Sequence, residues 1–436
     1  MSSLAHRLSE IAGAGYVLTG VECSPYVLEG RTPEAVVFPG SREEIAAILG
    51  VASELEVPVA PWGGGTHMSV GAPPARVGLV LGLRRLNRLV EHEPGDLTAT
   101  AEAGLTLAAL QAELGQRGQW LSLDPPFTDR ATVGGVLASN ASGPRRHLYG
   151  TARDLLLGLT MVLADGSVVR GGGKVVKNVA GYDLPKLAIG SFGTLGVIVE
   201  ATVKLRPRPD VDRLIVTGFD RLAAAGAAVR AIMASDLIPS AVDLADGAAL
   251  QAAGLGSPAG CAVLMGVDGL REQVDWQQAE LARLIGAVGT VLDGDARDAA
   301  WRGLGELGRR AFAQPTAAMK WGVLPSQVAD VMAEGRDVAV KHGLPAAFAA
   351  HAGVGIVSAV LGESADAGEV AATVEEWRRL VNGRGGHAAL EWAPLAVKER
   401  VPVWDAPGPA QRIMKRLKSE LDPRGILNPG RFVGGI

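Results

Sequence analysis

Apolar and polar residues alternate with two different periods near the start of the chain. A short apolar run at residues 35–38 has the character of a buried strand. Ser41 and Glu44 follow it at the spacing of a capping box, and the next apolar positions recur with the period of a helix as far as Glu54. A second strand-like run occupies residues 57–60. This order predicts a β-α-β unit whose second strand leads directly into a loop.

Short strands and turns are predicted for the next part of the chain. Strand-like runs lie at residues 77–81 and 97–101, and Thr106 is placed to cap a helix. Two prolines interrupt regular structure at residues 124–127. Between residues 133 and 203 glycine is frequent and the aliphatic runs are short. That composition is typical of strands and turns that wrap closely around a ligand.

The pattern changes after Arg206-Pro-Arg-Pro-Asp210, where alternate prolines favour an extended linker. Strand-like segments then alternate with helix-like ones, at residues 214–216, 261–267 and 290–292 for strands and 222–235, 272–284 and 326–342 for helices. Alanine-rich patches are typical of helices. The alternation predicts a mixed α+β domain in which helices cover a sheet.

These changes in pattern predict how the chain is divided. We expect a first domain at residues 1–208 and a second at 209–400. A C-terminal segment, residues 401–436, contains a basic amphipathic helix at 412–421 and then a run of turns that ends at Gly430.

Composition excludes several classes of protein. The 436 residues carry a formal net charge of only −4 with scattered basic residues, so a nucleic-acid partner is not expected. Apolar stretches such as residues 187–199 fall short of the roughly 20 residues that a membrane span needs. The start of the chain lacks the apolar region of a secretory signal, so we expect a cytoplasmic protein. Cys23 and Cys261 match no C-x-x-C spacing, so these thiols cannot assemble an iron–sulfur cluster or a structural zinc site.

The run Pro61-Trp-Gly-Gly-Gly-Thr-His-Met-Ser69 follows the second predicted strand. Glycines allow backbone N–H groups to converge on an anion such as a phosphate. The run lacks the Gly-Lys-Ser/Thr ending of a Walker loop and does not fit the dinucleotide pattern G-x-G-x-x-G. By itself it is therefore either a phosphate-binding loop or only a tight loop after a strand.

A longer glycine-rich signature follows, in the pieces TVGGVLASNASG (132–143), RRHLYG (145–150), NVAGYD (178–183) and GSFGTLGVI (190–198). In this order, and after the first loop, the pieces resemble the FAD-binding domain of the vanillyl-alcohol oxidase and para-cresol methylhydroxylase family. The resemblance covers about residues 30–206 together with Asn428-Pro-Gly430. Within the family, Gly181-Tyr182-Asp183 and Ser142-Gly-Pro-Arg-Arg146 are most similar to FAD-binding subunits of bacterial glycolate oxidases.

The resemblance implies a fold and a cofactor. The fold is α+β, with a two-lobed FAD-binding domain, a ferredoxin-like α+β cap domain and a C-terminal segment that packs back on the FAD domain. The resemblance implies that the first loop wraps the FAD pyrophosphate with backbone N–H groups. Of the two interpretations of this loop, it therefore favours the phosphate-binding loop. The implied cofactor contacts are Pro61, Trp62, Gly63, Gly64, Gly65, Thr66, His67, Met68, Ser69, Pro125, Thr132, Gly134, Gly135, Ser139, Ser142, Gly143, Tyr149 and Ile198.

His67 bears on whether the cofactor is covalently attached. Some relatives tether FAD through a histidine directly after the glycine pair, whereas here Thr66 intervenes before His67. We therefore expect FAD that dissociates, and His67 to be a partly buried loop residue.

Relatives that oxidise D-2-hydroxy acids have a two-histidine metal motif that resembles His-Ala-Gly-Asp-Gly-Asn-Leu-His. The matching stretch is His351-Ala-Gly-Val-Gly-Ile-Val-Ser358, in which Val354 and Ser358 replace the acid and the second histidine. A metal needs several ligands, and His351 by itself cannot supply them. We predict no metal site, and a catalytic motif that has lost its metal.

Three further residues of the second domain are candidates for catalysis. Glu391, in Gly385-Gly-His-Ala-Ala-Leu-Glu391, is offset from the carboxylate of active relatives. Lys320 and His387 stand beside strand-like sequence. Structural roles and catalytic roles both remain open for these residues and for His351.

Three functions therefore remain open. In the first, the chain is the FAD-binding subunit of a complex that oxidises glycolate to glyoxylate, with a catalytic flavoprotein subunit and an iron–sulfur subunit as partners that can also bring it to a membrane. In the second, it is a self-sufficient FAD dehydrogenase of a small 2-hydroxy acid such as D-lactate, with His351 as the base. The third is a nucleotide-binding regulatory protein without redox chemistry.

Overall fold

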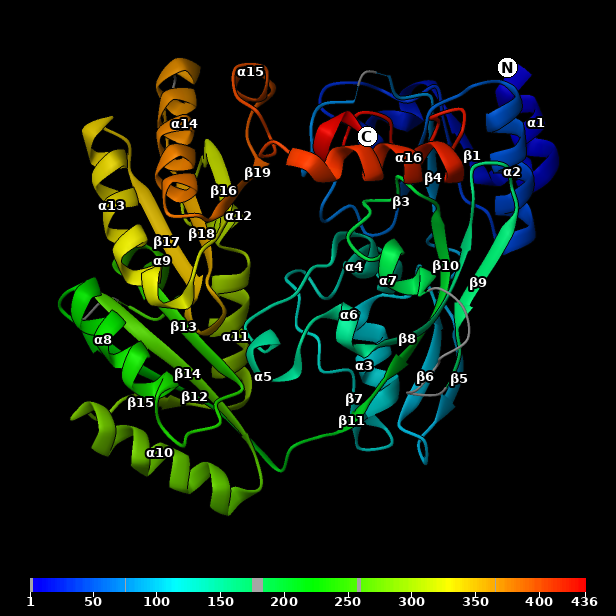
Figure 1. The fold of residues 1–436 in the computed structure, drawn as a ribbon. Helices are drawn as coiled ribbons and strands as arrows, with labels where there is room; N and C mark the ends of the chain where they lie inside the picture. The colour runs from blue at the N-terminus through cyan, green and yellow to red at the C-terminus, as the bar shows by residue number, and fades with distance from the viewer. Residues whose placement is uncertain (1–2, 75, 175–182, 257–259, 365) are drawn as a thin grey trace. The chain divides into compact units, whose positions relative to one another are not determined.

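The computed structural model describes residues 3–74, 76–174, 183–256, 260–364 and 366–436, which form two compact units (Figure 1). The first unit contains residues 1–141, 151–208 and 406–436, and the second contains residues 142–150 and 209–405. The chain thus enters the second unit after residue 208 and leaves it after residue 405. The short segment 142–150, which the sequence predicts in the first domain, belongs by its contacts to the second unit.

The first unit begins with a small sheet of mixed direction. Its strands follow the order β1-β2-β4-β3, with bounds Val17–Thr19, Ala35–Val37, Leu79–Gly82 and Val59–Trp62. Strands β2 and β3 both run parallel to β4. Helix α2 (Arg42–Glu54) connects β2 to β3, and the Ser41 hydroxyl accepts the N–H of Glu44 at 3.1 Å. The predicted β-α-β unit and its cap are confirmed.

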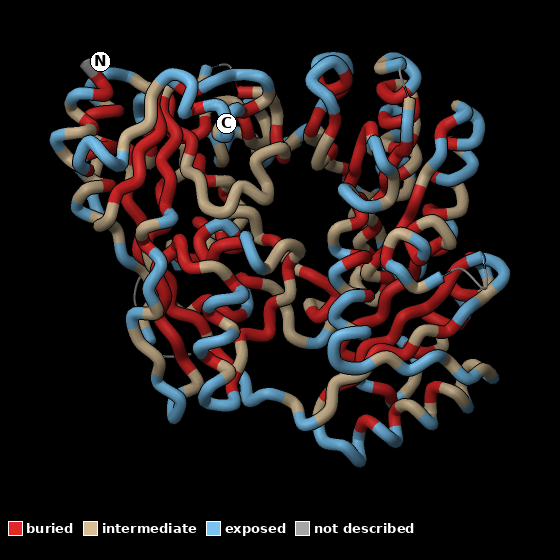
Figure 2. The backbone as a smooth tube through the Cα atoms, turned by 180° about the vertical axis from the view of Figure 1, so that it is seen from behind, coloured by how far each residue is buried: buried red, intermediate tan, exposed pale blue. Residues whose placement is uncertain are grey.

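A second, antiparallel sheet completes the core of the first unit. Its order is β5-β6-β10-β8-β9, with bounds Leu89–Glu93, Thr98–Glu102, Val197–Lys204, Leu156–Val162 and Val168–Gly172. Helices α3 (Leu107–Gly115) and α4 (Val133–Ser139) contribute to the same hydrophobic core, which Figure 2 shows as buried chain along the strands. Asp183 caps the short helix α7 (Leu184–Ala188), while residues 178–182 of the predicted signature lie outside the described residues.

The C-terminal segment returns to this first unit. After helix α16 (Gln411–Leu421), Leu427 forms a parallel bridge with Val59 of strand β3. The N–H of Val59 donates to Ile426 at 2.7 Å, and the N–H of Asn428 donates back to Val59 at 2.9 Å. The last residues of the chain are therefore fixed beside the strand that leads into the glycine run.

The second unit is built on one antiparallel sheet in the order β15-β12-β14-β13-β17-β18-β16-β19. The bounds in that order are Thr290–Leu292, Val211–Phe219, Cys261–Gly269, Ala241–Asp246, Ala346–His351, Ile356–Leu361, Ala317–Gly322 and His387–Trp392. Helices α8 (Leu222–Met233), α10 (Arg271–Ile285), α13 (Val328–Lys341) and α14 (Ala367–Gly383) pack together on the sheet (Figure 1). The predicted α+β character is confirmed.

The two faces of this sheet are buried by different helices. Trp321 of β16 and Phe348 of β17 stack against Trp377 of α14, with ring centroids 5.2 and 5.5 Å from it. The opposite face contributes Ala318, Ala347 and other small residues to a core with helices α9 (Gly247–Ala252), α11 (Gly294–Gly305) and α12 (Leu307–Arg310).

Strand β17 shows a limit of the local pattern. Its sequence is AAFAAH, and alanine-rich stretches are typical of helices. Here the segment is hydrogen-bonded between β13 and β18 with Phe348 buried on the tryptophan face, so tertiary packing overrides helix propensity.

Candidate functional site

A pocket in the first unit contains most of the predicted cofactor residues. It has an empty volume of about 770 Å³. The predicted residues that line it are Pro61, Trp62, Gly63, Gly64, Gly65, Thr66, His67, Met68, Thr132, Gly134, Gly135, Ser139 and Ile198. The β-α-β unit, helix α4 and strand β10 therefore meet at one cavity although they are far apart in the sequence.

The glycine run has its shape because side chains have no room there. A Cβ on Gly64 would overlap the carbonyl of Arg130. Gly65 has a φ of +70°, and a Cβ there would come within 2.9 Å of the ring of Trp62. Arg130 also donates to the carbonyl of Gly64 at 3.2 Å. Close packing thus holds the loop against the segment that precedes α4, with backbone atoms at the pocket wall.

Thr132 and Ser139 stand at the two ends of helix α4. The hydroxyl of Thr132 accepts the N–H of Gly135 at 3.3 Å, and the hydroxyl of Ser139 donates to the carbonyl of Gly135 at 2.8 Å. In this arrangement the oxygen of Ser139 can accept a further hydrogen bond from a ligand, while its proton is engaged. To donate to a cofactor oxygen, the hydroxyl of Ser139 would have to rotate away from Gly135.

Arg431 and Asn428 also line the pocket, although neither is among the cofactor contacts predicted from the sequence. Arg431 is 4% exposed, and one of its nitrogens donates to the carbonyls of Met68 and Val70, each at 2.6 Å. Burial lowers the pKa of its guanidinium, which still carries its charge at neutral pH. Asn428 donates to the carbonyl of Phe192 at 2.7 Å. The arginine directly after the Asn-Pro-Gly turn was the signal in the sequence.

The character of the pocket fits FAD. Backbone groups of the glycine run, the hydroxyl of Thr66 and the cation of Arg431 can surround a diphosphate. Leu83, Ala138, Val197 and Ile198 supply apolar wall for flat rings. The pocket thus combines the polar and apolar parts that a dinucleotide presents.

Five of the predicted cofactor contacts are not among the lining residues. Ser69 and Pro125 lie elsewhere in the first unit. Ser142, Gly143 and Tyr149 belong to the segment grouped with the second unit, in which the hydroxyl of Ser142 accepts a hydrogen bond from Arg146 at 3.1 Å. Their contacts with FAD stay predictions.

The register of the second unit's sheet brings the predicted catalytic residues to one face. Ser358 pairs with both Lys320 and Ala349. His351 lies two positions after Ala349 and therefore points to the same face. Glu391 contacts Lys320, with Nζ and Oε1 2.7 Å apart. His351, Ser358, Lys320 and Glu391 thus form a polar row across strands β17, β18, β16 and β19.

Asp243 extends this row to strand β13. Its Oδ2 is 2.9 Å from Nδ1 of His351, and its side chain is only 5% exposed. Neither Asp243 nor the nearby His147 is a predicted site residue: Asp243 lies in no motif, and His147 lies in the RRHLYG piece of the signature without an assigned role. Burial lowers the pKa of His147, and this effect is larger than the opposite effect of the Asp243 charge, which raises it.

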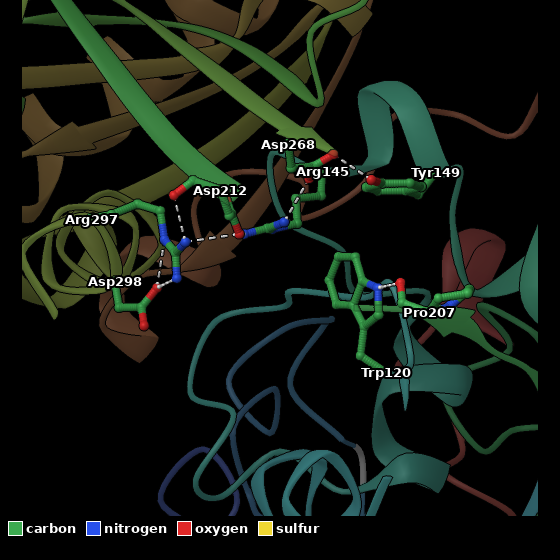
Figure 3. A network of polar contacts seen from close by, with 8 residues as sticks. All are labelled: Trp120, Arg145, Tyr149, Pro207, Asp212, Asp268, Arg297 and Asp298. Atoms are coloured by element: carbon green, nitrogen blue, oxygen red, sulfur yellow. Dashed lines mark hydrogen bonds and ion pairs between the residues drawn. The ribbon is translucent and has the colours of Figure 1, made fainter. Parts of the chain in front are cut away.

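A charged network holds the segment 142–150 on the same unit (Figure 3). Arg145 donates to Asp212 of β12 at 2.6 Å and to Asp268 of β14 at 2.9 Å. Tyr149 donates to the other oxygen of Asp268 at 2.5 Å, and Arg297 contacts Asp212 at 2.9 Å. Burial raises the pKa of Asp268 despite these partners. The network fixes the short helix that carries His147.

The described residues lack two kinds of feature. They contain no group of three or more His, Cys, Asp or Glu side chains that could hold a metal ion. Within the same part of the chain, no helix is both long enough and apolar enough to cross a membrane.

Comparisons with known protein families agree with the geometry of the first unit. A model of the FAD binding domain matches residues 33–172. A model described as the C-terminal domain of FAD linked oxidases matches residues 208–432. The two models together cover both units.

Two curated relatives match over nearly the whole chain, and a third matches over about half of it. One is the glycolate oxidase subunit GlcD of Bacillus subtilis, 32% identical over 92% of this chain and 89% of the relative. Another is a D-lactate dehydrogenase of Archaeoglobus fulgidus, 31% identical over 94% of each chain. A D-2-hydroxyglutarate dehydrogenase of Xanthomonas citri is 39% identical over 46% of this chain and 43% of the relative.

Solved structures show the same fold at low sequence identity. p-Cresol methylhydroxylase with substrate bound has a TM-score of 0.77 at 19% identity, over 98% of this chain and 96% of that one. A 4-ethylphenol oxidase of Gulosibacter chungangensis has a TM-score of 0.76 at 18% identity, over 99% and 96% of the two chains. The predicted two-domain α+β fold is confirmed.

Proposed function

Because this chain belongs to the FAD-linked oxidases, we propose that it is the FAD-binding subunit of an oxidase of small 2-hydroxy acids, with glycolate as the first candidate substrate. Glycolate would be oxidised to glyoxylate. The relatives named for glycolate oxidase and D-lactate dehydrogenase support the substrate class, since both substrates are small acids with a hydroxyl beside the carboxylate.

The observation that carries the proposal is the pocket of the first unit. Its glycine run, the Thr66 hydroxyl and the buried Arg431 line a single cavity with apolar residues of β10. His67 is partly buried, and its Nδ1 is 3.1 Å from the hydroxyl of Thr66. This arrangement supports FAD held by non-covalent contacts.

The polar row of the second unit supports an assignment of roles. Bound FAD supplies a two-electron acceptor that takes hydride from the substrate carbon. Lys320 is 43% exposed at its side chain and can hold the substrate carboxylate. His351 can accept the hydroxyl proton. Glu391, which contacts Lys320, holds the ammonium in place until the substrate carboxylate arrives.

Electrons must then leave the flavin. The chain has only Cys23 and Cys261, both buried and unpaired as thiols, so it offers no cluster for electron transfer. We propose an iron–sulfur subunit as the acceptor, with a further catalytic flavoprotein subunit, in a cytoplasmic complex that can associate with the membrane through its partners.

A second candidate is a self-sufficient dehydrogenase of a 2-hydroxy acid such as D-lactate. The observation that favours it is that His351 and Lys320 share one sheet face, so this chain retains a potential base and a carboxylate-binding cation. In that case a diffusible acceptor would oxidise the flavin.

An anaerobic absorption spectrum distinguishes these functions. The purified chain is reconstituted with FAD, and spectra are recorded before and after addition of glycolate and then D-lactate. Bleaching of the flavin band by either acid shows that this chain carries its own chemistry, and the acid that bleaches it is a substrate. A flavin band that neither acid bleaches supports a subunit that depends on a separate catalytic flavoprotein, and absence of any bound flavin supports the regulatory protein.

A further inference from the structure

Asp243 of strand β13 contacts Nδ1 of His351, which lies on the neighbouring strand β17. We infer that Asp243 is a positioning residue that fixes the ring tautomer of His351, so that Nε2 is presented as the proton acceptor. The inference rests on the proposed function. Asp243 is almost completely buried, whereas the side chain of His351 is 22% exposed, so one end of the pair is enclosed and the other reaches solvent.

The chemistry of the pair determines the tautomer. An ionised carboxylate can only accept hydrogen bonds, so at 2.9 Å from Asp243 the Nδ1 atom of His351 must be the donor. A neutral imidazole has one proton to share between its nitrogens, so Nε2 is left with its lone pair. Among the described residues, Nε2 has no hydrogen-bond partner. It is therefore open to a substrate hydroxyl.

The surroundings of Asp243 make His351 its ionic partner. His147 is the other imidazole close to this carboxylate, and burial lowers its pKa, which favours the neutral form. No arginine or lysine among the described residues forms an ion pair with Asp243. Lys320 is on β16, three strands along the sheet from β13, and contacts Glu391. The Asp243 carboxylate is thus available to hold Nδ1 both before and after the ring gains a proton.

The proposed step is balanced. Oxidation of a 2-hydroxy acid to a 2-oxo acid breaks one C–H bond and one O–H bond. The hydride from carbon goes to the flavin, which is the oxidant, and the proton from oxygen goes to Nε2 of His351. Asp243 neither gains nor loses a proton, because its hydrogen bond to Nδ1 of His351 is kept throughout.

Nitrogen-15 NMR of histidine-labelled protein tests the inference without substrate. The chain has seven histidines, and the His351→Gln variant identifies the signal of His351. At about pH 8.5, above the ordinary histidine pKa, we expect the Nδ1–H tautomer. In Asp243→Asn the new amide can donate to Nδ1, so the signal should change to the Nε2–H tautomer. A wild-type signal from Nε2–H, or no change in Asp243→Asn, overturns the inference.

Flavin reduction by substrate supplies the second readout. Asp243→Asn should slow anaerobic reduction by roughly 100-fold or more, with the FAD content unchanged, because the donor and acceptor atoms of the base are exchanged. Asp246→Asn, on the opposite face of strand β13, is the matched control and should leave both the tautomer and this rate unchanged. If the tautomers behave as expected but no 2-hydroxy acid reduces the wild-type flavin, the proposed role of His351 as the base fails and the positioning of the ring stands. Equal reduction rates in wild type and Asp243→Asn contradict the positioning role.

Discussion

Arg145 donates a hydrogen bond of 2.9 Å to Asp268, and it thereby ties a segment from the middle of the FAD-binding sequence to strand β14 of the second unit (Figure 3). The side chain of Asp268 is 1% exposed, and Asp212 is bound to the same guanidinium. Arg145 therefore bridges two carboxylates and fixes the segment that carries His147, while Arg297 is a second cation on Asp212. Within the first unit, Trp120 donates to Pro207 at 3.1 Å and fixes the strand that precedes the crossing into the second unit.

Replacement of Arg145 by methionine should destabilise the second unit by about 3 kcal/mol, because it leaves the buried Asp268 without its cation. Hydrogen exchange of residues 142–150 and of strands β12 and β14 should become faster. The control is Arg283→Met, since Arg283 is 73% exposed and its pair with Glu280 should contribute less than about 1 kcal/mol. Equal exchange in the two variants would contradict the role of Arg145.

Replacement of Gly135 by valine should abolish FAD binding while the fold is kept. A Cβ at this position meets only the hydroxyl of Thr132, at 3.1 Å, and the pocket has room for it only where the cofactor would lie. At Gly134 a Cβ would instead come within 2.6 Å of the Cβ of Ala103 in the core, so Gly134→Ala should lower stability. FAD titration and thermal melting separate the two effects. Full flavin content in Gly135→Val would rule out this placement of the cofactor.

Arg431→Met should weaken FAD binding by at least about tenfold. The substitution removes a buried cation of the pocket and the hydrogen bonds to Met68 and Val70 that hold the glycine run. Arg424→Met is the matched control, because Arg424 belongs to the same C-terminal segment but contacts Ser53 away from the pocket. Isothermal titration of the apoprotein with FAD gives both affinities, and similar values for the two variants would refute the proposal for Arg431.

Lys320→Met should raise the substrate KM by roughly 100-fold and leave FAD content unchanged. A carboxylate that loses its cationic partner loses about 2 to 3 kcal/mol of binding. The control is Lys341→Met. The side chain of Lys341, on helix α13, is 65% exposed and pairs with Glu376, so this substitution should change neither the KM nor the FAD content. Steady-state kinetics with glycolate and D-lactate check this. A KM that does not move would place carboxylate binding elsewhere.

Asp246 should give the second unit a measurable pH dependence. Burial raises the pKa of Asp246 from 3.8 to about 6, so between these values the folded chain binds a proton that the unfolded chain has released. The stabilisation that protonated Asp246 gives to the folded state is complete below about pH 4 and is lost as pH rises through about 6. The free energy of unfolding falls by up to about 3 kcal/mol over this range.

Asp246→Asn tests this without loss of the helix cap. The asparagine oxygen can still accept the N–H of Ala249, which Asp246 accepts at 2.9 Å. Urea midpoints of wild type and variant should diverge in favour of the variant between pH 4 and pH 7. A constant difference over that range would show that Asp246 does not titrate in this window.

The cofactor pocket could be predicted largely from the sequence. Pro61 to Met68 follow a strand directly, and the segment from Thr132 to Ser139 is contiguous, so local pattern and resemblance together locate these residues in the chain. Arg431 could not be assigned in this way. It reaches Met68 and Val70 only because Leu427 bridges to strand β3.

The polar row of the second unit depended on tertiary structure. His351 and Lys320 were predicted singly, and nothing local links them to Asp243, which lies 108 residues before His351. Strand order and register decide which residues share a face, and these depend on the packing of the whole sheet. The alanine-rich strand β17, which joins Asp243 to Ser358, has a local sequence that favours a helix.

The sequence by itself therefore determined the elements and loops whose signals are local: the capping box at Ser41, the glycine run, the break at Arg206 and the absence of a cysteine cluster. Only the tertiary structure decided the long-range partners, which include Arg145 with Asp268, Arg431 with the glycine run and Asp243 with His351. The physical reason is that backbone conformation and capping act over a few residues, whereas hydrogen bonds between buried charges depend on strand register and chain return.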